Sequence, residues 1–160
     1  MAGLAGSPGS ANGTGSSARF SYPSGVAVDG AGNVYVADSG NNMIRKVTPA
    51  AVVTTLAGFA GRPGSADGTN TNARFDGPGA LAADNSTNIY VSDVGNNTIR
   101  KMTPVGVNWV VTTAAGFVGS SGSADGTNSP ARCLINLVMW RWTAQAISMS
   151  RTRATARSDN

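Results

Sequence analysis

The chain has 160 residues, of which 21 are Gly and none is His, and its formal net charge is +4. It also contains no Glu, and its single cysteine, Cys133, cannot form an intrachain disulfide. This composition argues against long helices, and the frequent Gly-Asn and Asp-Gly pairs indicate turns between short strands. We therefore expect an all-β protein.

The chain begins with a match to a later strand end, because Leu4-Ala5-Gly6 resembles Leu56-Ala57-Gly58. A Gly-rich polar segment follows at 7–20, and related segments return at 62–75 and 120–133. Gly tolerates positive φ, and Asn, Asp and Ser side chains hydrogen-bond their own backbone, so we expect these segments to be connecting loops. We interpret residues 1–19 as the end of a preceding unit with its connecting loop.

Four short strands are expected after this loop. The first is predicted at 25–29, where Val26 and Val28 alternate with Ala27. A β-hairpin is predicted at 32–49, because β-branched and aromatic residues precede a Gly-Asn-Asn turn and a second strand that ends at a Thr-Pro pair. The fourth strand is predicted at 52–56.

The whole unit is repeated. The hairpin returns at 87–104 with 12 of 18 positions identical, displaced by 55 residues, and the fourth strand returns at 110–114 after three extra residues near the turn at 107–109. We place the units at 20–74 and 75–132, each with its connecting loop. A lone four-stranded antiparallel sheet cannot bury both faces, so the units are expected to stack as blades of an incomplete β-propeller.

The motifs PSGVAVD, GNVYVAD, NNMIRKV and VVTTLAG occur in this order, with an ARF motif between units. This order resembles the NHL-repeat β-propeller family over residues 4–133, as two full blades and part of a third. The resemblance implies a fragment of a larger propeller, for which we favour a secreted or cell-surface location. We expect four-stranded sheets at 20–59 and 75–117, with Val26, Val36 and Ile44, or their neighbours in the pleat, packed between them.

Six ionisable residues recur at equivalent positions of the two units: Asp29, Asp38, Arg45, Asp84, Asp93 and Arg100. A catalytic site would break the symmetry of the repeat, whereas these residues obey it. We therefore interpret them as structural, with their carboxylates accepting hydrogen bonds from turn N–H groups. We predict no catalytic, cofactor-binding or metal-binding residue.

Calcium is the one cofactor that the sequence leaves open. Asp67 and Asp125 lie in ADGTN segments, whose clustered oxygens are of the kind that Ca²⁺ accepts. However, Asn12 stands at this position in the first copy, the spacing is not that of an EF-hand, and no Glu is available. We therefore expect no cofactor.

Propellers that resemble this family include amidating lyases with a His-ligated zinc and gluconolactonase-type enzymes with an acidic metal site. Because this chain has no His and no Glu, we expect a noncatalytic binding or scaffold module whose loops contact an unknown protein or small-molecule ligand. One alternative is an inactive piece of a lyase- or lactonase-type propeller enzyme. Another is a structural spacer made of near-identical blades.

The distribution of charge bears on possible partners. A basic stripe of Lys46, Lys101, Arg45 and Arg100 would suit nucleic acid, but seven Asp up to Arg132 nearly cancel the charge and aromatic residues are sparse, so nucleic acid is not expected. Neither end has an apolar run of membrane length. Exposed sheet faces predict marginal stability and self-association.

The tail at 133–160 departs from the repeat and holds four Arg against one Asp. If the third base of each codon is read with the first two of the next, Met139-Trp140 gives Val and Trp142-Thr143 gives Asp. Permissible codon choices then convert the tail into FNQPGDVAVDSAGNIYVADTGNSTIRQ, which continues the blade pattern. We therefore interpret the tail as a third blade translated in a shifted reading frame, and we expect it to be poorly ordered or loosely packed.

Overall fold

The computed structural model describes residues 1–122, so the interpretation of 133–160 as a frame-shifted blade lies outside the described residues. The described part is built of strands and three short 3-10 helices, and it contains no α-helix. No helix within residues 1–122 is long and apolar enough to cross a membrane.

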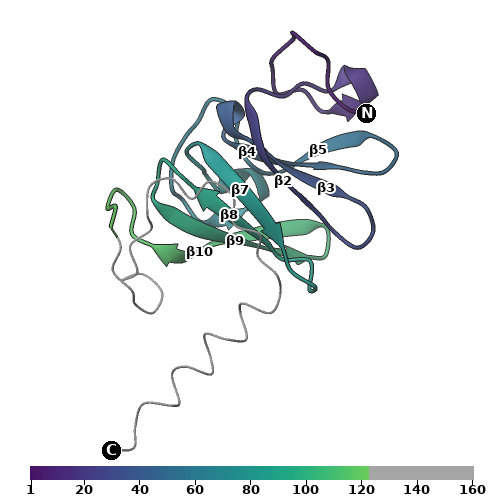
Figure 1. Ribbon diagram of the computed structural model, residues 1–160. Helices are drawn as coiled ribbons and strands as arrows, with labels where there is room; N and C mark the ends of the chain where they lie inside the picture. Colours follow the sequence, from purple (N-terminus) through teal and green to yellow (C-terminus); the bar gives the residue numbers. More distant parts are fainter. Residues whose placement is uncertain (123–160) are drawn as a thin grey trace, which may run out of the picture.

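The strands form two antiparallel sheets, which stand side by side (Figure 1). Sheet 1 has the order β1-β5-β4-β3-β2, and sheet 2 has the order β6-β10-β9-β8-β7. The strands of sheet 1 are β1 (Gly13–Thr14), β2 (Pro23–Val28), β3 (Val34–Asp38), β4 (Met43–Val47) and β5 (Val52–Gly58). Those of sheet 2 are β6 (Gly68–Thr69), β7 (Pro78–Ala83), β8 (Ile89–Asp93), β9 (Thr98–Val105) and β10 (Asn108–Gly116). The 3-10 helices are η1 (Gly15–Ser17), η2 (Ser39–Asn41) and η3 (Asn70–Asn72).

The four consecutive strands of each sheet confirm the predicted antiparallel blades, but each sheet also has a fifth strand that the sequence analysis did not predict. The Gly-rich connection supplies it: Gly13 pairs with Val53, and Gly68 pairs with Val111. The connection at 62–75 therefore adds its strand to the sheet that follows it in the chain. A blade is thus a connection plus the four strands after it.

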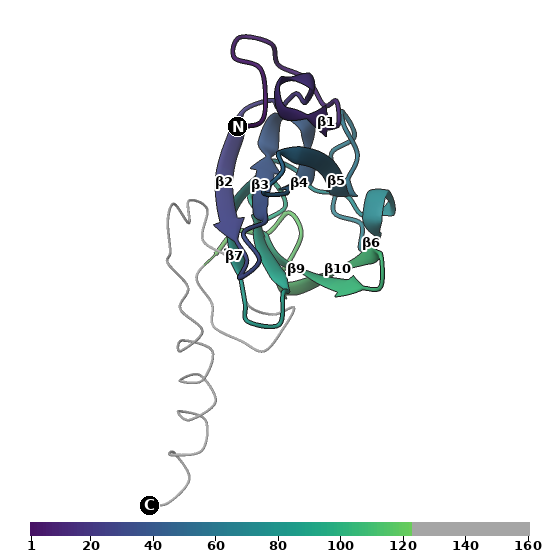
Figure 2. The same cartoon turned by 90° about the vertical axis from the view of Figure 1, so that its right-hand side faces the viewer.

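The two sheets stack with strands β2 and β7 against each other. Figure 2 shows these two strands on one side of the molecule, with β5 and β10 on the other. Register within each sheet is kept by pairing such as that between Val36 and Arg45. The three extra residues of the second unit lengthen its last hairpin, because β9 runs to Val105 and β10 begins at Asn108.

The core lies between the sheets. Tyr35, Ala37 and Ile44 of sheet 1 pack in one cluster with buried residues of sheet 2, among them Ile89 and Met102. Ile44 is therefore where it was predicted, together with the pleat neighbours of Val36. Val26 itself does not lie between the sheets, since it is 63% exposed, and its pleat neighbour Gly25 faces Gly79 of sheet 2 instead. Alternation along a strand defines two faces, and sheet 1 turns the Tyr35 face, not the Val26 face, toward sheet 2.

Candidate functional site

The most elaborate polar site in sheet 1 is centred on Arg45. Strand β4 holds Arg45, and Asp38 ends the neighbouring strand β3, so the hairpin brings the two side chains together. Arg45 Nη1 donates to Asp38 Oδ2 at 2.8 Å, and both side chains are 0% exposed. The same guanidinium donates to the carbonyl oxygens of Arg19 and Ala11, at 3.1 and 3.0 Å, and to Asn12 Oδ1 at 2.8 Å. One buried cation therefore binds the connection to the blade.

Asp38 holds the connection through its own hydrogen bonds. Its Oδ1 accepts from the backbone N–H of Ser21 at 2.7 Å, and its Oδ2 accepts from Asn41 Nδ2 at 2.8 Å. Asn41 also donates to the carbonyl of Gly9 at 2.7 Å. In the sequence Asn41 stands out only as part of the Gly-Asn-Asn turn, with no role of its own. The recurrence of this residue as Asn96 was the available signal.

Sheet 2 builds the same site with one change. Arg100 Nη1 donates to Asp93 Oδ2 at 2.9 Å, again with both side chains 0% exposed. Its guanidinium also reaches the carbonyls of Arg74 and Ala66, at 2.8 and 3.0 Å. Where Arg45 meets the Asn12 amide, Arg100 meets the Asp67 carboxylate at 2.7 Å. The Asp67 side chain is 51% exposed, so this second ion pair is partly solvated.

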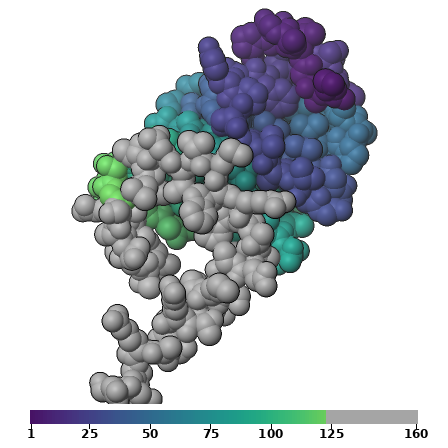
Figure 3. Space-filling view, in the orientation of Figure 1, coloured from purple at the N-terminus to yellow at the C-terminus, as the bar shows by residue number. Residues whose placement is uncertain are grey.

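The phenylalanine of each ARF motif covers the buried guanidinium. The Arg45 guanidinium carbon lies 5.2 Å from the centre of the Phe20 ring, and the corresponding distance from Arg100 to Phe75 is 5.3 Å. Cation–π contact of this kind favours a desolvated arginine. The phenylalanine of the ARF motif therefore covers the arginine. The first connection lies over one end of sheet 1 (Figure 3).

Burial dominates the electrostatics of Asp93. Burial raises the pKa of the Asp93 carboxyl above its usual value, although hydrogen bonds from Asn96, the Asp76 N–H and Arg100 act in the opposite direction. A desolvated carboxylate is retained at such a site only when it is paired and hydrogen-bonded, and Asp93 is both.

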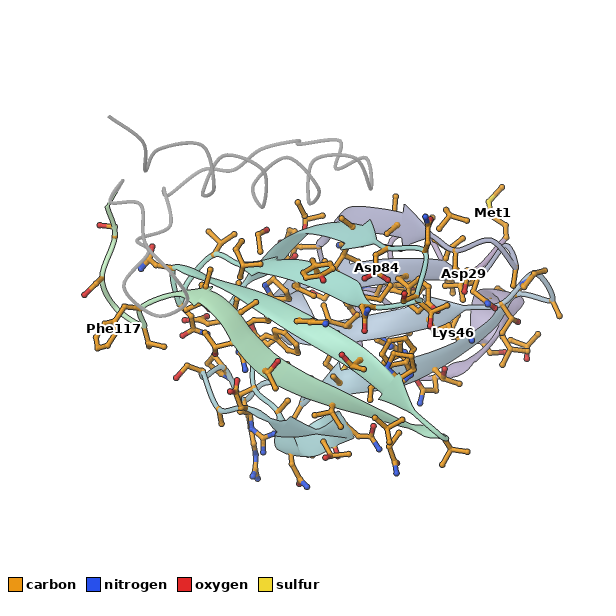
Figure 4. The ribbon with its side chains drawn as sticks, turned by 90° about the horizontal axis from the view of Figure 1, so that it is seen from below. Met1, Asp29, Lys46, Asp84 and Phe117 are labelled. Atoms are coloured by element: carbon orange, nitrogen blue, oxygen red, sulfur yellow. The ribbon has the colours of Figure 1, made fainter. Side chains whose placement is uncertain are left out.

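Asp29 and Asp84 serve a different place, the turn that follows strands β2 and β7. Asp29 Oδ1 accepts from the backbone N–H groups of Ala31 and Asn33, and Oδ2 accepts from the Tyr35 hydroxyl at 3.0 Å. Asp84 accepts equivalent turn bonds, and Figure 4 shows both carboxylates near one end of the stacked sheets, with Lys46 nearby.

The pKa values of these turn residues follow from their hydrogen bonds. Burial raises the pKa of Asp29, but the bonds from Asn33, Tyr35 and Ala31 outweigh it and leave the pKa below its usual value. At Asp84 burial is likewise outweighed, by bonds from Asn88 and Ser86 and by the charge of Lys101. Burial and the neighbouring Asp29 raise the pKa of Tyr35 to about 12.

These contacts limit what the carboxylates can do chemically. Asp38 and Asp93 are enclosed by donors, and no group of three or more His, Cys, Asp and Glu within residues 1–122 is placed to hold a metal ion. One oxygen of the Asp67 carboxylate, which is central to the calcium alternative, accepts hydrogen bonds from Arg100 and from the Thr113 hydroxyl. Asp125 lies outside the described residues. Arg45 and Arg100 are buried, which removes them from any basic surface stripe.

Comparisons with known proteins agree with this architecture. Residues 20–47 match the family model described as NHL repeat. NHL repeat-containing protein 2 of Homo sapiens is 36% identical over 97 residues, which cover 59% of this chain and 13% of that protein. Protein SUPPRESSOR OF QUENCHING 1, chloroplastic, of Arabidopsis thaliana is 34% identical over 90 residues, 56% of this chain and 8% of that protein. The chain thus spans only a small part of these relatives.

Solved structures give the same picture of the fold. A protein of unknown function from Bacteroides thetaiotaomicron VPI-5482 superposes with a TM-score of 0.59 and 27% identity, over 65% of this chain and 26% of its own. An auxiliary nutrient binding protein from Bacteroides ovatus ATCC 8483 superposes with a TM-score of 0.60 and 24% identity, over 77% of this chain and 32% of its own. These findings support an NHL-repeat family for this chain, and its two stacked antiparallel sheets are blades of a β-propeller.

Proposed function

We propose that this chain is a noncatalytic binding module, which presents the connections between its blades to a protein or small-molecule ligand. One observation carries the proposal: in both blades the buried Arg–Asp pair fastens the connection to the sheet through hydrogen bonds to its backbone. A connection held in this way is a rigid loop on a rigid scaffold, which is the usual arrangement of a binding surface.

Tyr22 is the residue of the first connection best suited to contact a ligand. The residue is 84% exposed, and its φ of 47° lies in the left-handed region that disfavours a side chain with a Cβ. The equivalent position of the second blade is Gly77, whose φ of 57° carries no such penalty. The first blade thus holds an exposed aromatic ring at a position where glycine would be more stable, and unfavourable backbone conformations of this kind cluster at binding sites.

The surrounding turn fixes the backbone next to this ring. Gly40 N–H donates to the carbonyl of Ser21 at 2.9 Å, and a Cβ added to Gly40 would lie 3.0 Å from Cδ2 of Tyr22. A large aromatic side chain on an ordered loop loses little conformational entropy on binding. Tyr22 therefore has the properties of a binding anchor.

The binding half of the proposal is tested with glycan and peptide arrays, probed with the chain and with its Tyr22→Gly variant. We expect at least one glycan or peptide whose affinity falls tenfold or more in Tyr22→Gly, while the unfolding midpoint of the variant is unchanged or higher. Equal binding by the two proteins, or no bound probe, would contradict the proposal. Val107→Gly, at a 95% exposed position, is the matched control and is expected to bind like the parent.

The noncatalytic half is tested with glucono-δ-lactone, the simplest substrate of the lactonase alternative. We expect hydrolysis at the buffer rate. The assay is run without and with added divalent metal. Saturable acceleration of lactone hydrolysis in either assay, in activity that copurifies with the protein, would overturn the noncatalytic assignment.

A further inference from the structure

The free face of sheet 1 is the repeat equivalent of a face that sheet 2 buries. On sheet 2, Leu81 and Ala83 pack against the core between the blades. Displaced by 55 residues, their counterparts Val26 and Val28 are 63% and 59% exposed. Equivalent apolar side chains are therefore buried on sheet 2 and exposed to solvent on sheet 1.

Other positions of this face show the same contrast. Phe75, in the connection that precedes β7, and Ile89 and Met102 of sheet 2 are fully buried. Their counterparts in the first unit are only partly buried: Phe20, Val34 and Val47. An exposed apolar face of this kind marks an interaction surface.

The structure also shows what fits this face. Sheet 1 covers the corresponding face of sheet 2 with its opposite surface, which includes Tyr35, Ile44 and Ala57. Sheet 2 repeats these three residues on its own outer surface as Tyr90, Ile99 and Ala115, all partly exposed. Two further positions differ: Ala37 is replaced by the polar Ser92, and Leu56 is replaced by the smaller Ala114. Each chain thus carries an open apolar face and, at its other end, a close copy of the surface that covers such a face.

We propose that the occupant is a second copy of this chain, with sheet 2 of one copy packed on sheet 1 of the next. The contact is heterologous, because the two surfaces that meet are different, and heterologous contacts that continue the rotation between blades close into rings. Propellers close at about four to eight blades, so a ring holds about two to four copies of this two-blade chain. This inference does not depend on the proposed ligand binding.

The contact between the inner strands predicts how well the copies fit. In the contact between β2 and β7, a Cβ added to Gly25 would lie 2.3 Å from the Gly79 carbonyl oxygen, so only glycine fits there. In the contact between copies, Ala80 takes the place of Gly25 and meets Ser24 of the next copy. The Ala80 methyl group therefore separates the inner strands at the new contact and weakens it relative to the one within the chain.

The test measures the mass of the full chain in solution, under reducing conditions, by sedimentation equilibrium from micromolar to near-millimolar concentration. We expect a discrete assembly of two, three or four copies at the upper end. Val26→Asp places a charge on the open face and is expected to raise the dissociation constant at least tenfold. The control Val107→Asp makes the same change at a turn position that is 95% exposed and lies off this face, and it is expected to leave the constant unchanged.

Ala80→Gly supplies a gain in affinity that misfolding cannot imitate. It removes the methyl group from the inner contact, so we expect a lower dissociation constant with unchanged circular dichroism. A chain that stays monomeric at every concentration, even as Ala80→Gly, would overturn the proposal. So would an open-ended polymer, or an equal effect of Val26→Asp and Val107→Asp.

Discussion

Arg45 and Asp38 form an ion pair of 2.8 Å in which neither side chain is exposed to solvent, and Arg100 and Asp93 repeat it at 2.9 Å in the next blade. Removing two charges from water costs several kcal/mol per ion, on the order of the attraction gained, so the pair alone does little for stability. What distinguishes this pair is that both partners also bind backbone groups of the connection. The pair therefore fastens the connection.

Breaking the pair from one side is expected to destabilise the fold strongly. In Arg45→Met the Asp38 carboxylate stays buried without its cation, which costs about 3–5 kcal/mol of unfolding free energy. Urea denaturation measures this change. Arg62→Met, at an exposed arginine, is the control and is expected to change stability by less than about 0.5 kcal/mol. Equal effects of the two substitutions would contradict a role for the buried pair.

The difference between the two blades predicts opposite effects of exchanging Asn12 and Asp67. Arg45 has one carboxylate partner and Arg100 has two, so Asn12→Asp should stabilise the chain and Asp67→Asn should destabilise it, each by about 0.5–1 kcal/mol. Because Asp67 is half exposed, about 1 M salt should shrink both effects. Urea denaturation in low and high salt tests this prediction, and two changes of the same sign would refute it.

Much of the fold follows from local sequence, and the remainder does not, for physical reasons. The hairpins were predictable because Val34, Tyr35 and Val36 favour a strand and the Gly-Asn-Asn turn ends it. Strand β1 was not, because Gly13 and Thr14 are only two residues and show no alternation. They pair with β5 beside Ala11, whose carbonyl accepts a hydrogen bond from Arg45.

The candidate site was predictable in its residues but not in its partners. The repeat marked Arg45 and Asp38, yet the guanidinium binds the carbonyls of Ala11 and Arg19. Because every residue has a backbone carbonyl, the pattern of side chains could not identify these acceptors. In the same way, alternation gives a strand two faces without saying which one meets the neighbouring blade, and this is why the sequence left open whether Val26 or its pleat neighbours lie between the sheets.

Acid is expected to weaken the turns that Asp29 and Asp84 hold. Their pKa values are lowered in the folded state, so their contribution is present above the usual value of 3.8 and is lost as pH falls through the folded pKa. Asp29→Asn should therefore lower the free energy of unfolding at about pH 7 and reduce the stability that is lost between about pH 5 and about pH 2. Urea denaturation at neutral pH and across this acid range measures both changes. Asp93 has a raised pKa and acts in the opposite sense, so its contribution is present below 3.8 and declines as pH rises through its folded pKa. A steeper acid loss in Asp29→Asn than in the parent would be inconsistent with this assignment.

Calcium is expected to find no site at Asp67, because the positively charged Arg100 guanidinium lies 2.7 Å from Asp67 Oδ1 and would repel a cation there. Titration calorimetry with CaCl₂ should give only heat of dilution. Saturable binding that disappears in Asp67→Ala but persists in Asp76→Ala would show that the cation displaces the arginine.

Amide hydrogen exchange on Arg45→Met tests most directly whether the buried arginine fastens the connection to its blade. In the parent, the amides of Arg19 and Ser21 donate to Ala11 O and to Asp38 Oδ1 and should be protected, as should the amide of Arg74, which donates to Ala66 O. The substitution should release the first two and leave Arg74 protected, because the Arg100 site of the second blade is intact. Unchanged protection of Arg19 and Ser21, or equal loss at Arg74, would contradict the account.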